Sequence, residues 1–278
     1  PPAGMSEPLA ALDEWPVGTA AAAVVGASGL LATHGPVGHR FPLASVTKPL
    51  AALAILVAVE EEAVSLDDPA DDALLPGATL RHLLAHASGV APERPMRSFP
   101  PAKRRVYSNV GIEIAAQLVE QAAGMPFPRY LHEALAQPLQ LTATTLDGSP
   151  ARDGRSSVED LARVAHELLS STGLLSDALR TELATVQYPG LRGVLPGFGG
   201  QDPNDWGLGF EIRGHKSPHW TGATNSAGTY GHFGQSGTFL WIDPVARLGL
   251  VALTDRDFDD WARQAWPKLA DAVLAAFT

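Results

Sequence analysis

The stretch Phe41-Pro42-Leu43-Ala44-Ser45-Val46-Thr47-Lys48-Pro49 leads into the most apolar segment of the chain. The residues that follow, Leu50 to Val59, are apolar without exception and rich in helix formers. A segment that is apolar on every side is typical of a buried helix rather than a surface helix. Because proline is tolerated only in a first helical turn, Pro49 predicts that the regular helix begins near Val46 or Thr47.

Ser45 and Lys48 are three residues apart, so their side chains share one face if the chain turns helical here. A serine hydroxyl is a weak nucleophile until a base takes its proton, and a lysine can be that base only where its pKa is lowered. The chain uses few lysines: Lys48, Lys103, Lys216 and Lys268 are its four, among 20 basic residues. Ser45 also stands where a helix N-cap is expected, so the spacing alone leaves a nucleophile and a cap both open.

Composition limits the classes of function. With 278 residues, 45% of them hydrophobic, the chain can form one large or two modest domains with an ample core. A net charge of -10 argues against nucleic acid or an anionic membrane as the main partner. The absence of cysteine excludes disulfides, thiolate metal sites and a cysteine nucleophile. We expect a small-molecule substrate and no cofactor.

No apolar run reaches the length of a transmembrane span. No lysine or arginine precedes Arg40, so the charged region that opens a signal peptide is not visible. We therefore expect a cytoplasmic protein, with a previously removed leader as the alternative.

The remaining pattern predicts helices in the middle of the chain and strands at its ends. A hairpin is expected over 19–33, with its turn at Gly26 to Gly29, and a short helix capped by Thr79 over 79–86. The other expected segments, in order, are a basic loop at 90–105, helices at 109–123, 127–136 and 157–170, a mobile loop or linker at 190–200, strands at 208–212, 237–242 and 248–254, and a helix at 258–277.

This order is explained by a helical domain inserted into a domain with a sheet. The predicted fold class is α+β, an antiparallel sheet flanked by helices with an inserted all-helical domain. We expect residues 1–62 and 201–278 to form the discontinuous sheet domain and residues 63–200 the helical domain, with an active site at their interface.

Two further motifs accompany Ser45 and Lys48. Tyr107-Ser108-Asn109 stands at the start of the helix expected at 109–123, and Tyr230-Gly231-His232-Phe233-Gly234-Gln235-Ser236-Gly237 precedes the strand expected at 237–242. Ser-x-x-Lys, then Tyr-x-Asn about sixty residues later, then His-x-Gly, resembles the serine β-lactamase and penicillin-recognising superfamily. The segment Leu83-Leu84-Ala85-His86-Ala87-Ser88-Gly89 is similar to its class C β-lactamase, DD-peptidase and esterase branch. The resemblance covers roughly residues 20–260.

The resemblance implies a role for each matching residue. Ser45 would be the nucleophile, Lys48 its proton acceptor and Tyr107 a proton shuttle. Asn109 would hydrogen-bond the substrate, and His232 holds the place of the basic residue in the third motif. The remaining substrate-binding positions are Phe233, Gly234 and Gln235. The backbone N–H groups of Ser45 and Gln235 would form the oxyanion hole.

The third motif departs from the family pattern, because Phe233 replaces a residue whose hydroxyl helps to bind a substrate carboxylate. We therefore expect a serine hydrolase that forms an acyl-enzyme on small esters or amides and does not prefer carboxylate-bearing substrates. The alternatives are a β-lactamase or D-Ala-D-Ala peptidase, or a penicillin-recognising fold kept as a non-catalytic binding protein. In the first alternative, Arg104 or Arg105 of the basic loop would bind the anion.

His82 and His86 are spaced as a helical metal pair would be. No glutamate follows His82, and the chain has no cysteine, so a metal site is not expected.

Overall fold

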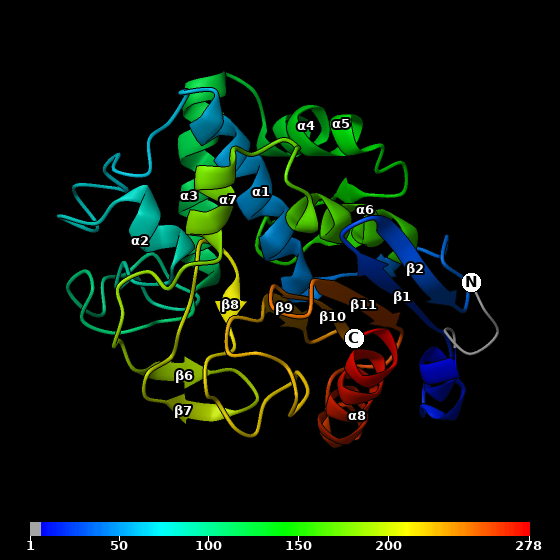
Figure 1. Ribbon diagram of the computed structural model, residues 1–278. Helices are drawn as coiled ribbons and strands as arrows, with labels where there is room; N and C mark the ends of the chain where they lie inside the picture. Colours follow the sequence, from blue (N-terminus) through cyan, green and yellow to red (C-terminus); the bar gives the residue numbers. More distant parts are fainter. Residues whose placement is uncertain (1–6) are drawn as a thin grey trace.

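The computed structural model describes residues 7–278, and its centre is a six-stranded antiparallel sheet (Figure 1). The strand order is β2-β1-β11-β10-β9-β8, so strands from both ends of the chain lie side by side. The strands are β1 (Ala20–Gly26), β2 (Gly29–His34), β8 (Glu211–Ile212), β9 (Tyr230–Gly234), β10 (Thr238–Asp243) and β11 (Leu248–Thr254). The predicted hairpin at 19–33 is confirmed, and Ala20 pairs with Thr254 across the junction of the two chain ends.

Both faces of the sheet are covered. The 3₁₀ helix η1 (Glu7–Glu14) and helix α8 (Asp260–Phe277) pack on one face, and helix α6 (Val158–Leu169) packs on the other, as Figure 1 shows. Every residue of β10 and β11 is buried. A sheet buried on two sides requires continuous apolar strands, which explains why these runs do not alternate with polar residues.

Helix α1 (Thr47–Glu60) is the centre of the helical part. All of its residues from Thr47 to Ala58 are buried, which confirms the buried helix predicted from its composition. The other helices are α2 (Leu80–Leu84), α3 (Asn109–Ala123), α4 (Phe127–Leu131), α5 (Gln137–Leu139) and α7 (Asp177–Leu183), with a π-helical turn at His132–Ala136. Thr79 caps α2 and Ser108 caps α3, each through its side-chain oxygen.

The predicted fold class is confirmed: an antiparallel sheet is flanked by helices and joined to a helical region. The division into residues 1–62 with 201–278 and residues 63–200 stays a prediction. One hydrophobic cluster runs from β1 and β11 through α1 and α6 to α3. Helix α6 packs against β1 and β11. If the domain boundary is defined by these contacts, α6 belongs to the sheet domain.

Three expectations for the second half of the chain were wrong. The expected mobile loop at 190–200 instead belongs to a hairpin of two strands, β6 (Gly193–Leu195) and β7 (Gly199–Gln201). The strand expected at 208–212 is only β8, because Gly209 has a φ of 79° and packs so closely on Ala52 that a Cβ would clash. Tyr230–Gly234 is a strand of its own, paired with β10.

A second small sheet, of β3 (Phe41–Pro42), β5 (Gly154–Ser156) and β4 (Thr145–Leu146), was not predicted. Between residues 7 and 278, no helix has both the length and the apolar character needed to cross a membrane.

Candidate active site

Ser45 lies in a 3₁₀ turn, Ala44–Val46, that runs directly into α1. The β9–β10 turn holds the residues before it: Thr238 Oγ1 donates to the Leu43 carbonyl at 2.9 Å, and Ser236 Oγ donates to the Pro42 carbonyl at 2.8 Å. A Cβ at Gly234 would clash with the Leu43 carbonyl and lie 3.2 Å from the Ser45 nitrogen. Glycine is therefore required at 234, and the backbone of β9 passes directly beside Ser45.

Lys48 contacts both of the other reactive side chains of the first two motifs, Ser45 and Tyr107. Its side chain is fully buried, and its Nζ donates to the Tyr107 hydroxyl at 2.6 Å and to Ser45 Oγ at 3.1 Å. The Tyr107 hydroxyl donates to Ser45 Oγ at 2.8 Å, which closes a triangle of hydrogen bonds. The third acceptor of Lys48 is the Ala151 carbonyl, at 3.1 Å, which no sequence signal indicated. The structure thus brings Ser45, Lys48 and Tyr107 into direct contact.

Burial determines the protonation states of this group. Burial lowers the pKa of Lys48 to about 7, and the positive charge of Arg152 acts in the same direction. The carboxylates of Glu93 and Glu113 raise the pKa and oppose this shift. Burial raises the pKa of Tyr107, although its hydrogen bond with Ser45 acts in the opposite direction. Near neutral pH a substantial fraction of Lys48 is therefore uncharged, while Tyr107 keeps its proton.

His232 does not supply the positive charge that the third motif suggested. Burial, followed by the charge of Lys48, lowers the pKa of His232 to about 3. Its ring lies near Tyr107 and Trp206, with centroid distances of 5.9 and 5.4 Å, and its Nδ1 lies 2.8 Å from the Phe233 carbonyl. A neutral histidine here cannot stabilise a phenolate at Tyr107.

The side chain of Phe233 lies on the other face of the sheet. Its ring packs 4.8 Å from the ring of Phe258 and 5.8 Å from that of Trp220, within the cluster beneath α8. Neighbouring residues of a strand point to opposite faces, so placing His232 towards Tyr107 turns Phe233 away. The expectation that the side chain at position 233 contacts substrate is therefore not supported. Gln235 is exposed at the end of β9, and its Nε2 donates to the Phe258 carbonyl at 3.2 Å.

His86 positions the second motif. Its Nδ1 accepts from the Ser108 backbone N–H at 3.1 Å, and its ring packs against Tyr107 at 4.8 Å and Trp206 at 4.6 Å. His82 instead accepts from the Thr79 backbone N–H at 3.0 Å as part of a capping box. The two histidines thus serve separate structural roles. Residues 7–278 hold no group of three or more His, Cys, Asp or Glu arranged for a metal ion.

Asn109 lies two residues after Tyr107, but its amide is engaged. Asn109 Nδ2 donates to Glu93 Oε1 at 2.6 Å, and Glu93 Oε2 pairs with Arg152 at 3.3 Å. Arg152 directly follows Ala151, whose carbonyl accepts from Lys48. A loop residue, Glu93, thereby joins Asn109 and Arg152. Neither Glu93 nor Arg152 was singled out from the sequence as a site residue.

The basic loop contributes one cation to the interior. Arg105 is buried and donates to the carbonyls of Ala85, Gln187 and Asn204 at 2.8–3.0 Å. With these donors satisfied by the backbone, Arg105 is a structural residue and not the anion site considered from the sequence. Burial lowers its pKa to about 10.

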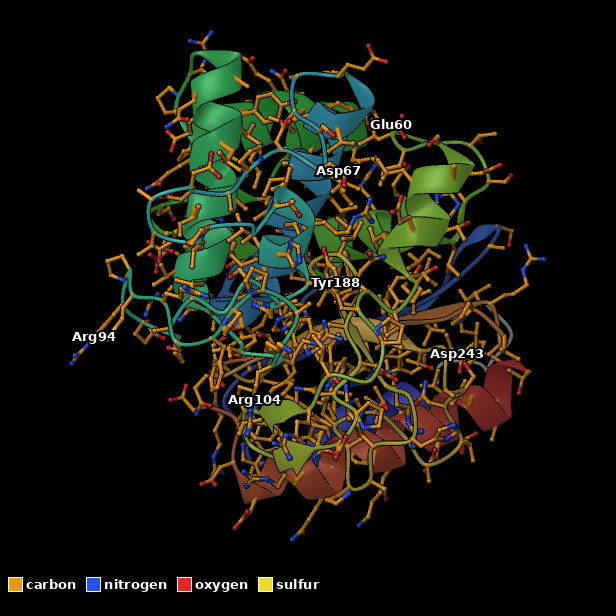
Figure 2. All side chains as sticks on the ribbon, turned by 90° about the vertical axis from the view of Figure 1, so that its left-hand side faces the viewer. Glu60, Asp67, Arg94, Arg104, Tyr188 and Asp243 are labelled. Atoms are coloured by element: carbon orange, nitrogen blue, oxygen red, sulfur yellow. The ribbon has the colours of Figure 1, made fainter. Side chains whose placement is uncertain are left out.

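Arg104 covers the Phe99 ring at 5.5 Å and lies near the β6–β7 hairpin, whereas Arg94 extends outward (Figure 2). Between this loop and the hairpin lies a cavity of about 320 Å³ that reaches Tyr107. Its other lining residues include Pro92, Val106, Val194 and Pro196.

Comparisons with known proteins identify the family and the fold of this chain. The family model described as Beta-lactamase matches residues 17–275. A crystal structure of a beta-lactamase from Mycobacterium bovis is 54% identical, covering 98% of this chain and 99% of that chain with a TM-score of 0.95. Simvastatin synthase from Aspergillus terreus is 20% identical over 97% of this chain and 96% of that chain, with a TM-score of 0.79, and shows a shared fold alone.

Among curated proteins, a putative D-alanyl-D-alanine carboxypeptidase from Escherichia coli O157:H7 is 26% identical over 202 residues. The match covers 57% of this chain and 46% of that protein. The chain thus spans about half the length of the curated relatives that it matches.

Proposed function

This chain belongs to the beta-lactamase family, and from that premise we propose that it is a serine hydrolase that forms an acyl-enzyme with small, uncharged esters or amides. The observation that carries the proposal is the hydrogen-bonded triangle of Ser45, Lys48 and Tyr107. A hydroxyl that contacts a lysine with a lowered pKa meets the requirement for an activated nucleophile.

In the proposed reaction, uncharged Lys48 accepts the proton of Ser45 as Oγ attacks the substrate carbonyl. The N–H groups of Ser45 and Gln235 stabilise the oxyanion, as the family pattern implies. When the leaving group departs, Tyr107 gives it a proton and takes one from Lys48, which lies 2.6 Å away. Lys48 is then uncharged again and can accept a proton from the water that hydrolyses the acyl-enzyme.

The surroundings support an uncharged substrate. Three arginines already have partners: Arg105 donates to backbone carbonyls, Arg104 lies over the Phe99 ring, and Arg152 pairs with Glu93. The cavity beside Tyr107 has a mainly apolar lining. An apolar group of an ester would gain by leaving water for this cavity.

Hydrolysis of β-lactams is the second candidate. It is favoured by one observation, that the structure with 54% identity over nearly its full length is described as a beta-lactamase. Both reactions would use the same acyl-enzyme at Ser45, so they differ in substrate and not in machinery.

Mass spectrometry of the intact protein tests the proposal. After exposure to a fluorophosphonate, nitrophenyl acetate or a penicillin, we expect one covalent adduct, which peptide mapping assigns to Ser45. Ser45→Ala should form no adduct, whereas Ser171→Ala, a change at an exposed serine, should react like the unaltered protein. An adduct on another serine, or undiminished turnover by Ser45→Ala, would remove the assignment. A long-lived penicillin adduct with fast ester turnover would favour the esterase over the β-lactamase.

A further inference from the structure

Glu93 holds the side chains of Asn109 and Arg152, two residues that lie close in the chain to Tyr107 and to the carbonyl acceptor of Lys48. One carboxylate oxygen accepts from Asn109 Nδ2 at 2.6 Å, and the other pairs with Arg152 at 3.3 Å. The loop that carries Glu93 is tied to the same place, because the Asn109 backbone N–H donates to the Pro92 carbonyl at 3.0 Å. Glu93 therefore bridges the start of α3 and the segment 151–152, which hold Tyr107 and the acceptor of Lys48.

The bridge lies at the surface and can open. The side chains of Glu93 and Arg152 are 58% and 49% exposed. Ion pairs that are exposed to this degree are weak, because water solvates both charges and salt screens them. The amide oxygen of Asn109, in contrast, is buried and accepts no hydrogen bond from the described part of the chain. Asn109 is thus only half satisfied by the bridge.

We propose that Glu93 is a specificity-determining residue that occupies Arg152 and Asn109 and thereby disfavours substrates carrying a carboxylate. The inference rests on the proposed hydrolase function. A substrate carboxylate that pairs with Arg152 must displace Glu93 from the guanidinium, and it must also approach the negative charge of Glu93 itself. A neutral substrate meets neither obstacle. Removing the charge of Glu93 frees Arg152 to receive the anion.

The chain offers a control for simple electrostatics. Glu93 and Glu113 both raise the pKa of Lys48, but Glu113 makes neither of the two contacts that define the bridge. The other charged or titratable groups around Lys48 are Arg152, Tyr107, His86 and His232. Glu113→Gln therefore alters the charge near Lys48 and leaves the bridge in place.

The experiment compares two substrates of similar length, nitrophenyl hexanoate and nitrophenyl hydrogen adipate, at pH 8.5. The quantity measured is the kcat/KM for the adipate divided by that for the hexanoate, after subtraction of the rate with Ser45→Ala. A ratio cancels any change in Lys48 that affects both substrates alike. We expect Glu93→Gln to raise this ratio about three- to fivefold, the effect of freeing one partly exposed charge. Glu93→Gln/Arg152→Gln should lose the gain, and Glu113→Gln should change the ratio less than about twofold.

An unchanged ratio in Glu93→Gln, or an equal rise in Glu113→Gln, would overturn the inference. A gain that persists in the double variant would also overturn it, because Arg152 would then not be the anion site. These results are distinguishable from failure of the proposed function, in which the unaltered protein hydrolyses neither ester and forms no adduct at Ser45.

Discussion

The amine of Lys48 and the phenol of Tyr107 lie 2.6 Å apart, yet burial shifts their pKa values in opposite directions. Removal from water disfavours the charged form of each group, which is the ammonium of lysine and the phenolate of tyrosine. The proton therefore stays on Tyr107, while Lys48 loses its own near neutral pH. In the proposed mechanism, Lys48 is therefore the base for Ser45 Oγ and Tyr107 is the proton donor.

The pH dependence of ester hydrolysis should report Lys48. Because the uncharged amine is the active form and its pKa is lowered to about 7, kcat/KM should rise with pH through a single limb near 7 and then level off. His232, with a pKa of about 3, should add no limb between pH 5 and pH 8. Pre-steady-state or steady-state rates over pH 5–10 measure this. A rate that shows no limb near 7 and still rises at pH 10 would show that the pKa of Lys48 keeps its ordinary value of 10.5.

Arginine should not replace Lys48. Arginine keeps a positive charge but cannot give up its proton at neutral pH. We expect Lys48→Arg and Lys48→Ala both to lose about 10²- to 10⁴-fold in kcat, the usual contribution of a general base. Lys103→Arg, at an exposed lysine of the basic loop, is the matched control. If Lys48→Arg kept most of the rate, Lys48 would be an electrostatic anchor and the base would lie elsewhere.

The same burial should make Lys48 costly for stability. A folded-state pKa of about 7 against an unfolded value of 10.5 means that the unfolded chain binds more protons between these limits, so stability rises with pH through this window. Below pH 7 the folded protein holds a buried ammonium, at a cost of about 3–5 kcal/mol. Lys48→Met removes this cost and should therefore gain stability. The substitution also loses the three hydrogen bonds of Lys48, which offsets part of the gain.

We expect Lys48→Met to be inactive and yet to unfold at higher urea concentration than the unaltered protein at pH 6. The difference should shrink as the pH approaches 10. Urea titrations at pH 6, 8 and 10 measure it. A Lys48→Met variant that is less stable than the unaltered protein at pH 6 would show that the hydrogen bonds outweigh the burial of charge.

Local signals explain which parts of the fold could be predicted. The apolar run after Pro49 lies within α1, and Ser108 directly precedes α3 as its cap, so both helices lie close to their predicted positions. The hairpin β6–β7 has no such signal. It is aligned by backbone contacts of Arg105 with Arg192 and Gly193, almost ninety residues further along the chain, and its glycines suggested only a loop.

In the candidate site, too, residues in local motifs could be predicted, whereas contacts between distant residues could not. Ser45, Lys48 and Tyr107 belong to motifs with fixed spacing, and the structure brings them together. The contact of Glu93 with Arg152 joins residues far apart in sequence, which no single-chain pattern reveals. Strand alternation would have turned Phe233 away from the site once His232 was placed towards it, but the sequence did not show that Tyr230–Gly234 is a strand.

Phe233→Thr should therefore affect stability and not substrate choice. The ring packs among Phe258, Trp220 and Trp266, so its removal should cost about 3 kcal/mol of unfolding free energy. We expect the ratio of kcat/KM for carboxylate-bearing and neutral esters to stay within about twofold of its original value, in contrast to the effect expected for Glu93→Gln. Phe233→Leu, which keeps an apolar side chain, should lose less stability. A ratio that moves strongly towards carboxylate substrates would restore position 233 to the site.

The cavity beside Tyr107 should set the preference for apolar groups of the ester. Val194 of β6 lines this cavity with Phe99, and the two side chains are 63% and 37% exposed. Each methylene that leaves water contributes about 0.8 kcal/mol, so a longer acyl or alcohol chain that enters the cavity gains several-fold in kcat/KM.

A carboxylate at position 194 would remove this gain, because it draws water into the lining. We expect Val194→Asp to lower the ratio of kcat/KM for nitrophenyl hexanoate over nitrophenyl acetate about five- to tenfold. Val245→Asp, at a valine that is 77% exposed and does not line the cavity, is the control and should leave the ratio unchanged. If both variants behaved alike, the longer chain would bind elsewhere, and the cavity would have no part in choosing the substrate.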